Sequence, residues 1–432
     1  MFRNLLPLVI GCAVLLLGSS GLSAASSKPA VGERNGDADS YPADVNGYGT
    51  SEQARLLEGA LERYRDIERH GGWAAVPTDL VMGPGYSYDC KRIAAFEKRL
   101  VVEGYLREED RTLPPPAPEP TAAEAKAARK QQPPPSSQPR NQPMGLWGPC
   151  PYSPALTAAV KAFQVDRSVL GVGQLASRTM TQLNRPVEEI VEILEQDLAR
   201  WRGVSLDRLG SYLLVDIPFF ELVAYENGHE TLRMPVVVGK RDWQTPSLHA
   251  EVQSILLNPD WGIPEKIAKV EYLPLAARDS GYLRRQGITN DGGSLRQKPG
   301  PNNPLGRVKF VMPNPDDIYL HDTPAKGAFD AAVKALSHGC VRLSNAAELA
   351  SYLLREDSQW SLRRLQAAIS SGQTQGISLR RRMPVTIIYS TSRVNEDGRL
   401  ELRPDVYGKN RMRPIQERDS TDAIDKDVDT GP

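Results

Sequence analysis

IYLHDTP at residues 318–324 and SHGCVR at residues 337–342 are the two stretches that decide how this chain is interpreted. The first carries His321, and the second carries His338 two residues before Cys340. A thiol whose pKa is about 8.5 is a poor nucleophile until a neighbour lowers that value or removes the proton. Gly339 would also let the backbone approach a reacting carbonyl closely, so that nearby amide N–H groups face the oxyanion. The two stretches therefore contain the parts of an acyl-transfer site.

Two other interpretations of the same residues remain open on spacing alone. A lone cysteine is more often a small core residue than a nucleophile, and an exposed histidine is usually only solvated. A zinc site could use His321, His338 and Cys340 with Asp322 as the fourth ligand. Against zinc, the His-Gly-Cys spacing matches no common structural-zinc pattern, and the chain has no Cys-x-x-Cys.

Around these stretches, residues 207–405 change from a helical period to the alternation typical of strands. The Asn227-Gly228 pair predicts a two-residue hairpin turn between two of those strands. Helices are expected to interrupt the strands at residues 346–355 and 361–370. Strands are expected at residues 211–218, 220–226, 229–240, 248–258, 308–313, 318–321, 385–391 and 400–403. We predict one mostly-β domain with helical insertions.

Helical patterns dominate the chain before residue 207. Residues 51–113 predict a helical scaffold, and residues 150–185 predict a compact helical module in which Ser177 caps a short helix. A connecting helix is expected over 186–206. Between the scaffold and the module, residues 114–149 indicate a linker or insertion, because ten prolines lie between Pro114 and Pro143 among Ala, Gln and Ser.

Residues 1–25 have the three regions of a secretory signal peptide: Arg3, an apolar stretch over 5–17, and small residues up to Ala25. The alternative is an uncleaved N-terminal anchor. We expect an exported protein with no membrane span in its mature form. Residues 26–50 and the acidic tail over 406–432 are expected to be disordered.

Export changes how the four cysteines are interpreted, because Cys12 would leave with the signal peptide. The remaining three allow three pairings, with one thiol left free. We favour Cys90 with Cys150, because that disulfide would hold together the two flanks of the Pro-rich insertion. Cys340 would then be the free thiol.

The overall composition excludes several classes of function. Lys and Arg together number 53, as do Asp and Glu, so the formal charge is zero. Broad nucleic-acid binding is not expected, because it needs a basic stripe to replace phosphate counterions. Collagen, coiled-coil and fully disordered compositions are excluded as well.

The HD and SHGCxR motifs at residues 321–322 and 337–342 resemble the signature of the L,D-transpeptidase (YkuD-type) catalytic domain. The flanking segments NPDWGIP (258–264), LRQKPGP (295–301) and LGRVKF (305–310) resemble that family too. The pattern is most similar to the large periplasmic YcbB-type members, which carry a helical scaffold and a peptidoglycan-binding-like module. Residues 150–185 resemble that module but have Gly171-Val172-Gly173 where an Asp-Gly turn is usual.

This resemblance implies a multidomain α+β protein whose mostly-β YkuD-like catalytic domain follows the scaffold and the module. It implies that Cys340 is the nucleophile and that His321 is the general base, oriented by the backbone carbonyl of Asp322. His338 and the amides around Gly339 would support the oxyanion. Substrate contacts are expected at Arg342, Ser337 and Tyr319, and Trp261 could line the cleft. No metal, cofactor or ATP is needed.

The implied reaction is acyl transfer from a tetrapeptide donor stem, with release of D-Ala, to the diaminopimelate amine of an acceptor stem. The product is a 3→3 cross-link in the periplasm, made by a monomer whose partners are peptidoglycan stem peptides. Residues 271–303 would form a capping loop that gates entry. The alternatives are an L,D-carboxypeptidase, an enzyme that anchors a lipoprotein to peptidoglycan, and a non-catalytic wall-binding protein.

Overall fold

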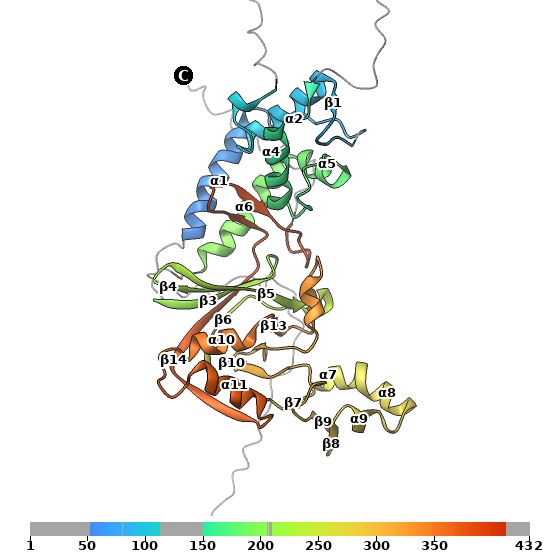
Figure 1. Cartoon of the computed structure of the whole chain (residues 1–432), viewed down its shortest axis with the longest axis vertical. Helices are drawn as coiled ribbons and strands as arrows, with labels where there is room; N and C mark the ends of the chain where they lie inside the picture. Colours follow the sequence, from blue (N-terminus) through green and yellow to red (C-terminus); the bar gives the residue numbers. More distant parts are fainter. Residues whose placement is uncertain (1–51, 80, 113–149, 205, 207–209, 412–432) are drawn as a thin grey trace, which may run out of the picture. The chain divides into compact units, whose positions relative to one another are not determined.

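The computed structural model describes residues 52–79, 81–112, 150–204, 206 and 210–411 (Figure 1). Three expected segments lie outside this described part: the signal peptide with the lead-in (1–50), the Pro-rich segment (114–149) and residues 412–432 of the tail. Within it, no helix is both long and apolar enough to cross a membrane.

A nine-stranded sheet forms the centre of the domain that follows the helical region. Its strand order is β12-β5-β13-β11-β10-β6-β14-β3-β4. The last strand, β4, also pairs with β5, so the strands from β5 to β4 form a closed ring of pairings. Most neighbours are antiparallel, but β14 pairs with β3, β11 with β13 and β12 with β5 in parallel. The strands are β3 (Ser211–Asp216), β4 (Glu221–Glu226), β5 (His229–Gly239), β6 (Leu248–Leu257), β10 (Val308–Val311), β11 (Leu320–His321), β12 (Ala335–Ser337), β13 (Val341–Leu343) and β14 (Gln375–Ile388).

The hairpin between β4 and β5 shows how local sequence sets the register of this sheet. Asn227 and Gly228 have φ angles of 51° and 83°, both in the left-handed region that a tight hairpin turn of the primed type requires. Glu226 consequently lies opposite His229. The turn expected from the Asn-Gly pair is therefore present.

The core of the domain is apolar, and two helices pack onto it. Helices α10 (Ala346–Leu353) and α11 (Leu362–Ser370) contribute Leu349 and Leu365, which are almost fully buried. They join buried strand residues that include Leu213, Val236, Ile255, Phe310, Leu320 and Val341. This core places the ends of β11 and β13 side by side.

The strands expected before residue 330 and the strand at 400–403 are present, with ends shifted by a few residues. The start of the expected strand at 385–391 was wrong, because β14 begins at Gln375. This strand pairs with β6 in two blocks, with a register shift between Ser378 and Met383. Its first half is rich in arginine and largely exposed, so it lacks the alternation used to find strands. The short strands β12 and β13 were not expected.

Two helical clusters precede the sheet. Helices α1 (Glu52–Arg69) and α6 (Val187–Arg202) pack together and against Leu214, Ile388 and the hairpin β15–β16 (Ser392–Val394 and Leu400–Leu402). The second cluster comprises α2 (Cys90–Val102), α4 (Pro154–Asp166) and α5 (Ser177–Leu183). Ser177 is not the cap of α5: the capping position is Ala176, which provides no side-chain hydrogen bond.

Cys90 and Cys150 form a disulfide with an S–S distance of 2.10 Å, at the two-stranded pairing of β1 (Ser87–Tyr88) with β2 (Cys150–Pro151). The bond connects the start of α2 to the segment that leads into α4. Cys340 is a free cysteine.

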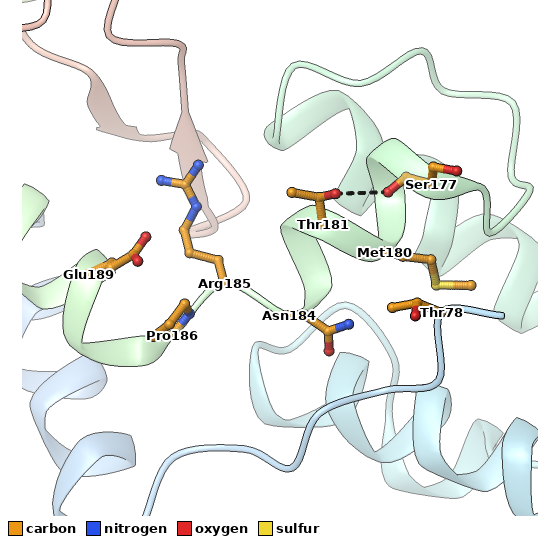
Figure 2. Close-up of a pocket in the computed structure, with 8 residues that line it drawn as sticks. All are labelled: Thr78, Ser177, Met180, Thr181, Asn184, Arg185, Pro186 and Glu189. Atoms are coloured by element: carbon orange, nitrogen blue, oxygen red, sulfur yellow. Dashed lines mark hydrogen bonds between the residues drawn. The ribbon is translucent and has the colours of Figure 1, made fainter. Parts of the chain in front are cut away.

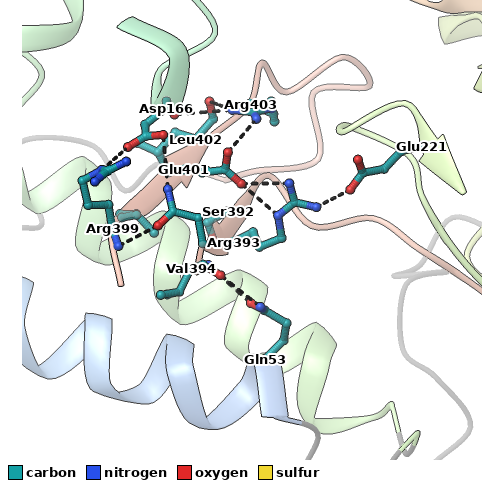
Figure 3. Close-up of polar contacts among 12 residues, drawn as sticks. Gln53, Asp166, Glu221, Ser392, Arg393, Val394, Arg399, Glu401, Leu402 and Arg403 are labelled. Carbon is teal, nitrogen blue, oxygen red and sulfur yellow. Dashed lines mark hydrogen bonds and ion pairs between the residues drawn. The ribbon is translucent and has the colours of Figure 1, made fainter. Parts of the chain in front are cut away.

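The hairpin β15–β16 joins the helices to the sheet through polar contacts (Figure 3). The Gln53 amide donates to the backbone carbonyl of Val394, at 3.1 Å. Arg399 pairs with Asp166 of α4 at 2.9 Å, and Arg393 pairs with Glu221 of β4. This short hairpin is thus bonded to α1, α4 and the nine-stranded sheet.

Residues 261–297 form a small folded unit that we name the cap. It contains strands β7 (Trp261–Gly262), β8 (Ile288–Asp291) and β9 (Ser294–Gln297), short helices α7 (Glu265–Ile267), α8 (Leu273–Arg278) and α9 (Tyr282–Arg285), and a π-helix at Ala268–Tyr272. Figure 1 shows these elements grouped together. Where a capping loop over 271–303 was expected, the chain has its own sheet and apolar cluster, beginning at Trp261.

The packed chain continues past residue 405, where the tail was expected to begin. Tyr407 is only 4% exposed, and its hydroxyl donates to the carbonyl of Gly239 at 2.7 Å and accepts from the N–H of Thr245 at 3.1 Å. These bonds fix the described end of the chain against β5.

Candidate active site

A cavity of about 970 Å³ opens where the ends of β10, β11 and β13 meet the cap. Cys340 lines it together with His321, His338 and Arg342, all predicted from the sequence. Trp261 and Lys266 of the cap also line it. The structure therefore brings the two deciding stretches to one cavity.

Residues 337–342, which we name the catalytic loop, connect β12 to β13. Gly339 has a φ of 110°, a backbone conformation that residues with a Cβ rarely adopt. The Ser337 hydroxyl donates to the Cys340 carbonyl at 2.6 Å and accepts from the Gly339 N–H at 3.1 Å. The Thr245 hydroxyl donates to the Gly339 carbonyl at 2.6 Å. These bonds connect the loop on both sides of Cys340. They also occupy the Ser337 side chain, which was expected to contact substrate.

The Cys340 thiol is half-buried and faces Tyr319. Its sulfur lies 3.9 Å from the Asp317 carbonyl. Burial raises the pKa of the thiol, while the Tyr319 backbone N–H and hydroxyl, and the charges of Lys309 and Arg342, act in the opposite direction. Burial is the larger effect, so the neutral thiol predominates near pH 7.

His321 lies at the end of β11, one strand over from Cys340, and is only 4% exposed. Its Nδ1 lies 2.5 Å from the backbone carbonyl of Asp322, so Nδ1 carries the proton and Nε2 is left as the basic nitrogen. Burial, reinforced by the positive charges of Arg342 and Lys309, lowers the pKa of His321 to about 3. The imidazole is therefore neutral at pH 7.

The side chain of Asp322 points away from this chemistry. Its Oδ2 accepts from the Arg307 N–H at 2.9 Å, and its Oδ1 pairs with Lys326 at 2.7 Å. Only the backbone carbonyl of Asp322 contacts His321. Its carboxylate stabilises the turn before β10.

Tyr319 connects three neighbours at the cavity wall. Burial, followed by the effect of Cys340, raises the pKa of its phenol, so the hydroxyl remains protonated and can donate to the sulfur. The phenol also has a hydrogen bond with the side chain of Trp261 in the cap. Lys309 lies over the Tyr319 ring, with Nζ 3.7 Å from the ring centroid.

His338 points toward the cap. Its Nε2 lies 2.6 Å from Oε1 of Glu271 in the π-helix, and its ring meets the Trp243 ring edge to face at 4.9 Å. Lys266 in turn lies 4.1 Å from the centroid of Trp243.

Arg342 lies on β13, and burial lowers the pKa of its guanidinium. Its Nε is buried and has no hydrogen-bond partner among the described residues. Lys309, whose pKa is also lowered by burial, makes no ion pair with a described carboxylate. The cavity thus contains two largely buried cationic side chains, neither of which forms an ion pair with a described carboxylate.

Several residues of this site were not expected from the sequence. Lys309, Glu271, Thr245 and Trp243 reach the catalytic loop only through tertiary folding; for example, Glu271 is 67 residues from His338 in the chain. Only Lys309 lay within a quoted motif, LGRVKF, for which no role of the lysine was predicted.

No group of three His, Cys, Asp or Glu side chains suited to a metal ion occurs in the part of the chain that the structure describes. A second cavity, of about 510 Å³, lies away from Cys340 in the helical region (Figure 2). Its wall includes Ser177, Thr181, Arg185 and Glu189, which belong to α5, α6 and their connection.

Comparison with known proteins agrees with this geometry. Residues 210–387 match the model of the YkuD family, the L,D-transpeptidase catalytic domain. A Haemophilus influenzae protein named "Putative L,D-transpeptidase" is 33% identical over 221 residues, which cover 46% of this chain and 45% of that protein. The resemblance inferred for the catalytic domain from the sequence motifs is thereby confirmed.

Among solved structures, an L,D-transpeptidase from Mycobacterium smegmatis aligns over 41% of this chain and 58% of its own, at 13% identity and a TM-score of 0.25. L,D-transpeptidase 3 from Mycobacterium tuberculosis, in complex with a faropenem-derived adduct, aligns over 41% and 60%, at 16% identity and a TM-score of 0.23. The chain spans less than half the length of the curated relative that it matches.

Proposed function

We propose that this chain is an L,D-transpeptidase of peptidoglycan in which Cys340 is the nucleophile. The observation that carries the proposal is the free thiol of Cys340 in one cavity with His321, whose protonated nitrogen is fixed by a backbone carbonyl. A nucleophile beside an oriented imidazole is the arrangement that covalent acyl transfer requires.

In the first half-reaction, the Cys340 sulfur attacks the amide carbonyl between the third residue and the terminal D-Ala of a tetrapeptide stem. Nε2 of His321 takes the thiol proton and passes it to the D-Ala amine as the C–N bond breaks, which leaves a thioester. In the second half-reaction, the diaminopimelate amine of an acceptor stem attacks the thioester. The S–C bond breaks, the proton returns to sulfur, and the product is a 3→3 cross-link.

The resting site is neutral, since the pKa of Cys340 is raised and that of His321 is lowered. Proton transfer therefore accompanies attack on the carbonyl rather than preceding it. A neutral thiol is also a poor partner for thiol–disulfide exchange, which suits a free cysteine in an oxidising compartment.

In this proposal, the backbone N–H of Cys340 and the side chain of His338 stabilise the oxyanion. The Gly339 N–H already donates to Ser337, so it is not available to the substrate. The Cys340 N–H has no hydrogen-bond partner among the residues that the structure describes, and it lies next to the sulfur. It is the best-placed amide donor for the tetrahedral intermediate.

Lys309 and Arg342 would bind a carboxylate of the donor stem. Both side chains are largely buried at the cavity and form no direct ion pair with a described carboxylate, and Nε of Arg342 has no hydrogen-bond partner among the described residues. A buried guanidinium is stabilised when a ligand supplies the missing acceptor. Tyr319 would hold the sulfur between them and the scissile amide.

The YcbB-type architecture, the peptidoglycan-binding role of residues 150–185, the periplasmic location and the monomeric state are parts of the same proposal. The helical clusters before the sheet and the cap beside the cavity support the architecture. The cavity of Figure 2 is a candidate wall-binding surface because its lining mixes hydroxyl and charged groups.

Product analysis tests the proposal against its alternatives. The full chain is incubated with purified disaccharide-tetrapeptide, and the products are separated and identified by mass spectrometry beside a Cys340→Ala control. We expect a cross-linked dimer that the control does not form. Tripeptide without dimer would instead identify an L,D-carboxypeptidase. If neither product forms, addition of a lipoprotein with a C-terminal lysine separates an anchoring enzyme from a non-catalytic wall-binding protein.

A further inference from the structure

The cap contacts the rest of the cavity wall through two charged side chains, one at the catalytic loop and one at Trp243. Glu271, in the π-helix, pairs with Nε2 of His338 at 2.6 Å, and Lys266 lies 4.1 Å from the ring centroid of Trp243. His338 and Trp243 contact each other edge to face, at 4.9 Å and 88°. The four side chains therefore form a connected set, two from the cap and two from the catalytic domain, which we name the clasp.

The local fold of the cap directs Glu271 toward this contact. Ile267 and Ala268 are buried in the apolar cluster of the cap. Glu271 follows Ile267 by four residues and Ala268 by three. It therefore lies about one helical turn after them, on the same side of the helical segment. A π-helix at this position adds to the argument, because such segments occur frequently at functional sites.

The contact defines which nitrogen of His338 carries a proton. Because the Glu271 carboxylate only accepts, Nε2 of His338 must donate to it. The other ring nitrogen, Nδ1, is then the one left for the substrate. It can donate to the oxyanion only when it also carries a proton, as in an imidazolium whose charge the Glu271 carboxylate balances. An imidazole held in one tautomer by a carboxylate is a recurring device for orienting catalytic histidines.

Glu271 also affects a second group beside the nucleophile. Its negative charge acts on Arg342, where it partly offsets the effect of burial on the guanidinium pKa. The Glu271 carboxylate of the cap therefore acts on both His338 and Arg342, which lie on either side of Cys340 in the sequence.

We propose that Glu271 is a positioning residue for acyl transfer at Cys340, which it supports by orienting His338 and docking the cap on the catalytic loop. The inference rests on the proposed transpeptidase function, because it assigns His338 to the oxyanion. Glu271 itself does not contact the reacting atoms in this account; it acts through His338.

The test compares Glu271→Ala and Glu271→Gln with a matched control, Glu265→Gln. Glu265 lies six residues earlier in the same cap, pairs with Lys269 at 2.5 Å and does not line the cavity. We expect Glu271→Ala to lower kcat about 10- to 100-fold with little change in KM, since it removes a charge-assisted hydrogen bond. Glu271→Gln keeps an acceptor and should recover most of that loss, and Glu265→Gln should resemble the native chain.

Two further measurements separate positioning from simple damage to the fold. Alkylation of Cys340 by iodoacetamide should proceed at the same rate in all four proteins, because the small reagent does not use His338. Nitrogen-15 NMR of the histidine rings should show protonated Nε2 at His338 in the native chain and a changed tautomer balance in Glu271→Ala.

The inference would be overturned if Glu271→Ala transferred acyl groups as fast as Glu265→Gln or faster, or if its His338 tautomer were unchanged. The NMR measurement needs no turnover. If the native chain showed no transferase activity while the tautomer still depended on Glu271, the proposed function would fail but the clasp would stand.

Discussion

Cys340 and His321 are both held in their neutral protonation states near pH 7. Burial raises the pKa of the thiol, and burial with two nearby cations lowers the pKa of the imidazole to about 3. The resulting neutral pair differs from the thiolate–imidazolium pair that activates many cysteine nucleophiles.

The pH dependence of Cys340 alkylation follows directly from these shifts. Because burial raises the thiol pKa above its ordinary value, the thiolate fraction should rise about tenfold for each pH unit between pH 6 and 8. The second-order rate constant for iodoacetamide should rise in the same proportion. A rate that is constant from pH 6 to 8 would indicate a preformed thiolate and contradict this account. The Cys340→Ala variant corrects for background labelling.

Lys309 offers a second prediction at the residue scale. If its ammonium binds a donor carboxylate, Lys309→Met should raise KM for a tetrapeptide with a free terminal carboxylate by about 10- to 100-fold. The same substitution should change KM little when that terminus is amidated, provided the terminal carboxylate is the one bound. The control is Lys298→Met, in an exposed position outside the cavity lining. If Lys309→Met changed KM equally for the free and the amidated tetrapeptide, Lys309 would bind a group other than the terminal carboxylate.

At the scale of elements, the cap contributes directly to the site. Its first strand, β7, carries Trp261, whose side chain is hydrogen-bonded to the Tyr319 phenol, and that phenol interacts with Cys340. The cap and the thiol are thus connected through one tyrosine, independently of the contact between Glu271 and His338.

Trp261→Phe tests this connection because it removes the indole N–H and keeps an aromatic ring. We expect kcat to fall by up to about tenfold, the usual effect of one hydrogen bond, with the thermal midpoint little changed. Steady-state kinetics beside a thermal melt would check it. An unchanged kcat would show that the position of Tyr319 does not depend on the cap.

Comparison of these elements shows what the sequence could and could not predict. His321 and Cys340 lie in short motifs on β11 and in the catalytic loop, so their chemistry could be inferred without knowledge of the fold. Glu271 and Thr245 contact the same loop from 67 and 94 residues away, and no local pattern indicates such contacts. The cap was expected as a loop because residues 271–303 are polar and rich in Gly and Pro and its strands are short.

At the scale of the whole molecule, buried charges link the helical region to the hairpin β15–β16. Glu103 is fully buried and pairs with Arg99 and Arg167, each at 2.6 Å, and it accepts a hydrogen bond from Tyr64 at 2.6 Å. Arg167 also donates to the carbonyl of Leu400 in the hairpin. This network joins α1, α2 and α4 to the segment that follows the catalytic sheet.

Glu103→Gln should therefore destabilise the chain strongly. Removal of one partner leaves two buried guanidinium groups without their counter-charge, at a cost of about 3–5 kcal/mol. Glu62→Gln, in an exposed pair with Arg69 on α1, is the matched control and should cost less than about 1 kcal/mol. Urea unfolding of the three proteins at pH 7 would measure the difference. A similar loss in both variants would contradict a special role for the network.

The same network predicts sensitivity to acid. Burial alone would raise the pKa of Glu103, but Arg167 and Arg99 outweigh it and hold the pKa below its ordinary value. A carboxyl group whose pKa is lower in the folded state contributes its full stabilisation above the unfolded value, near pH 4.5. That contribution is lost as the pH falls through the folded value, so the difference between native and Glu103→Gln chains should shrink in acid.

The most direct test of the central claim is the mass of the intact full-length protein after brief incubation with disaccharide-tetrapeptide, followed by peptide mapping. This account predicts an adduct equal to the donor stem without its terminal D-Ala, located on Cys340 and absent from Cys340→Ala. Cross-linking that persists in Cys340→Ala, an adduct on a different residue, or Cys340 found in a disulfide with Cys90 or Cys150 in the native protein would contradict it.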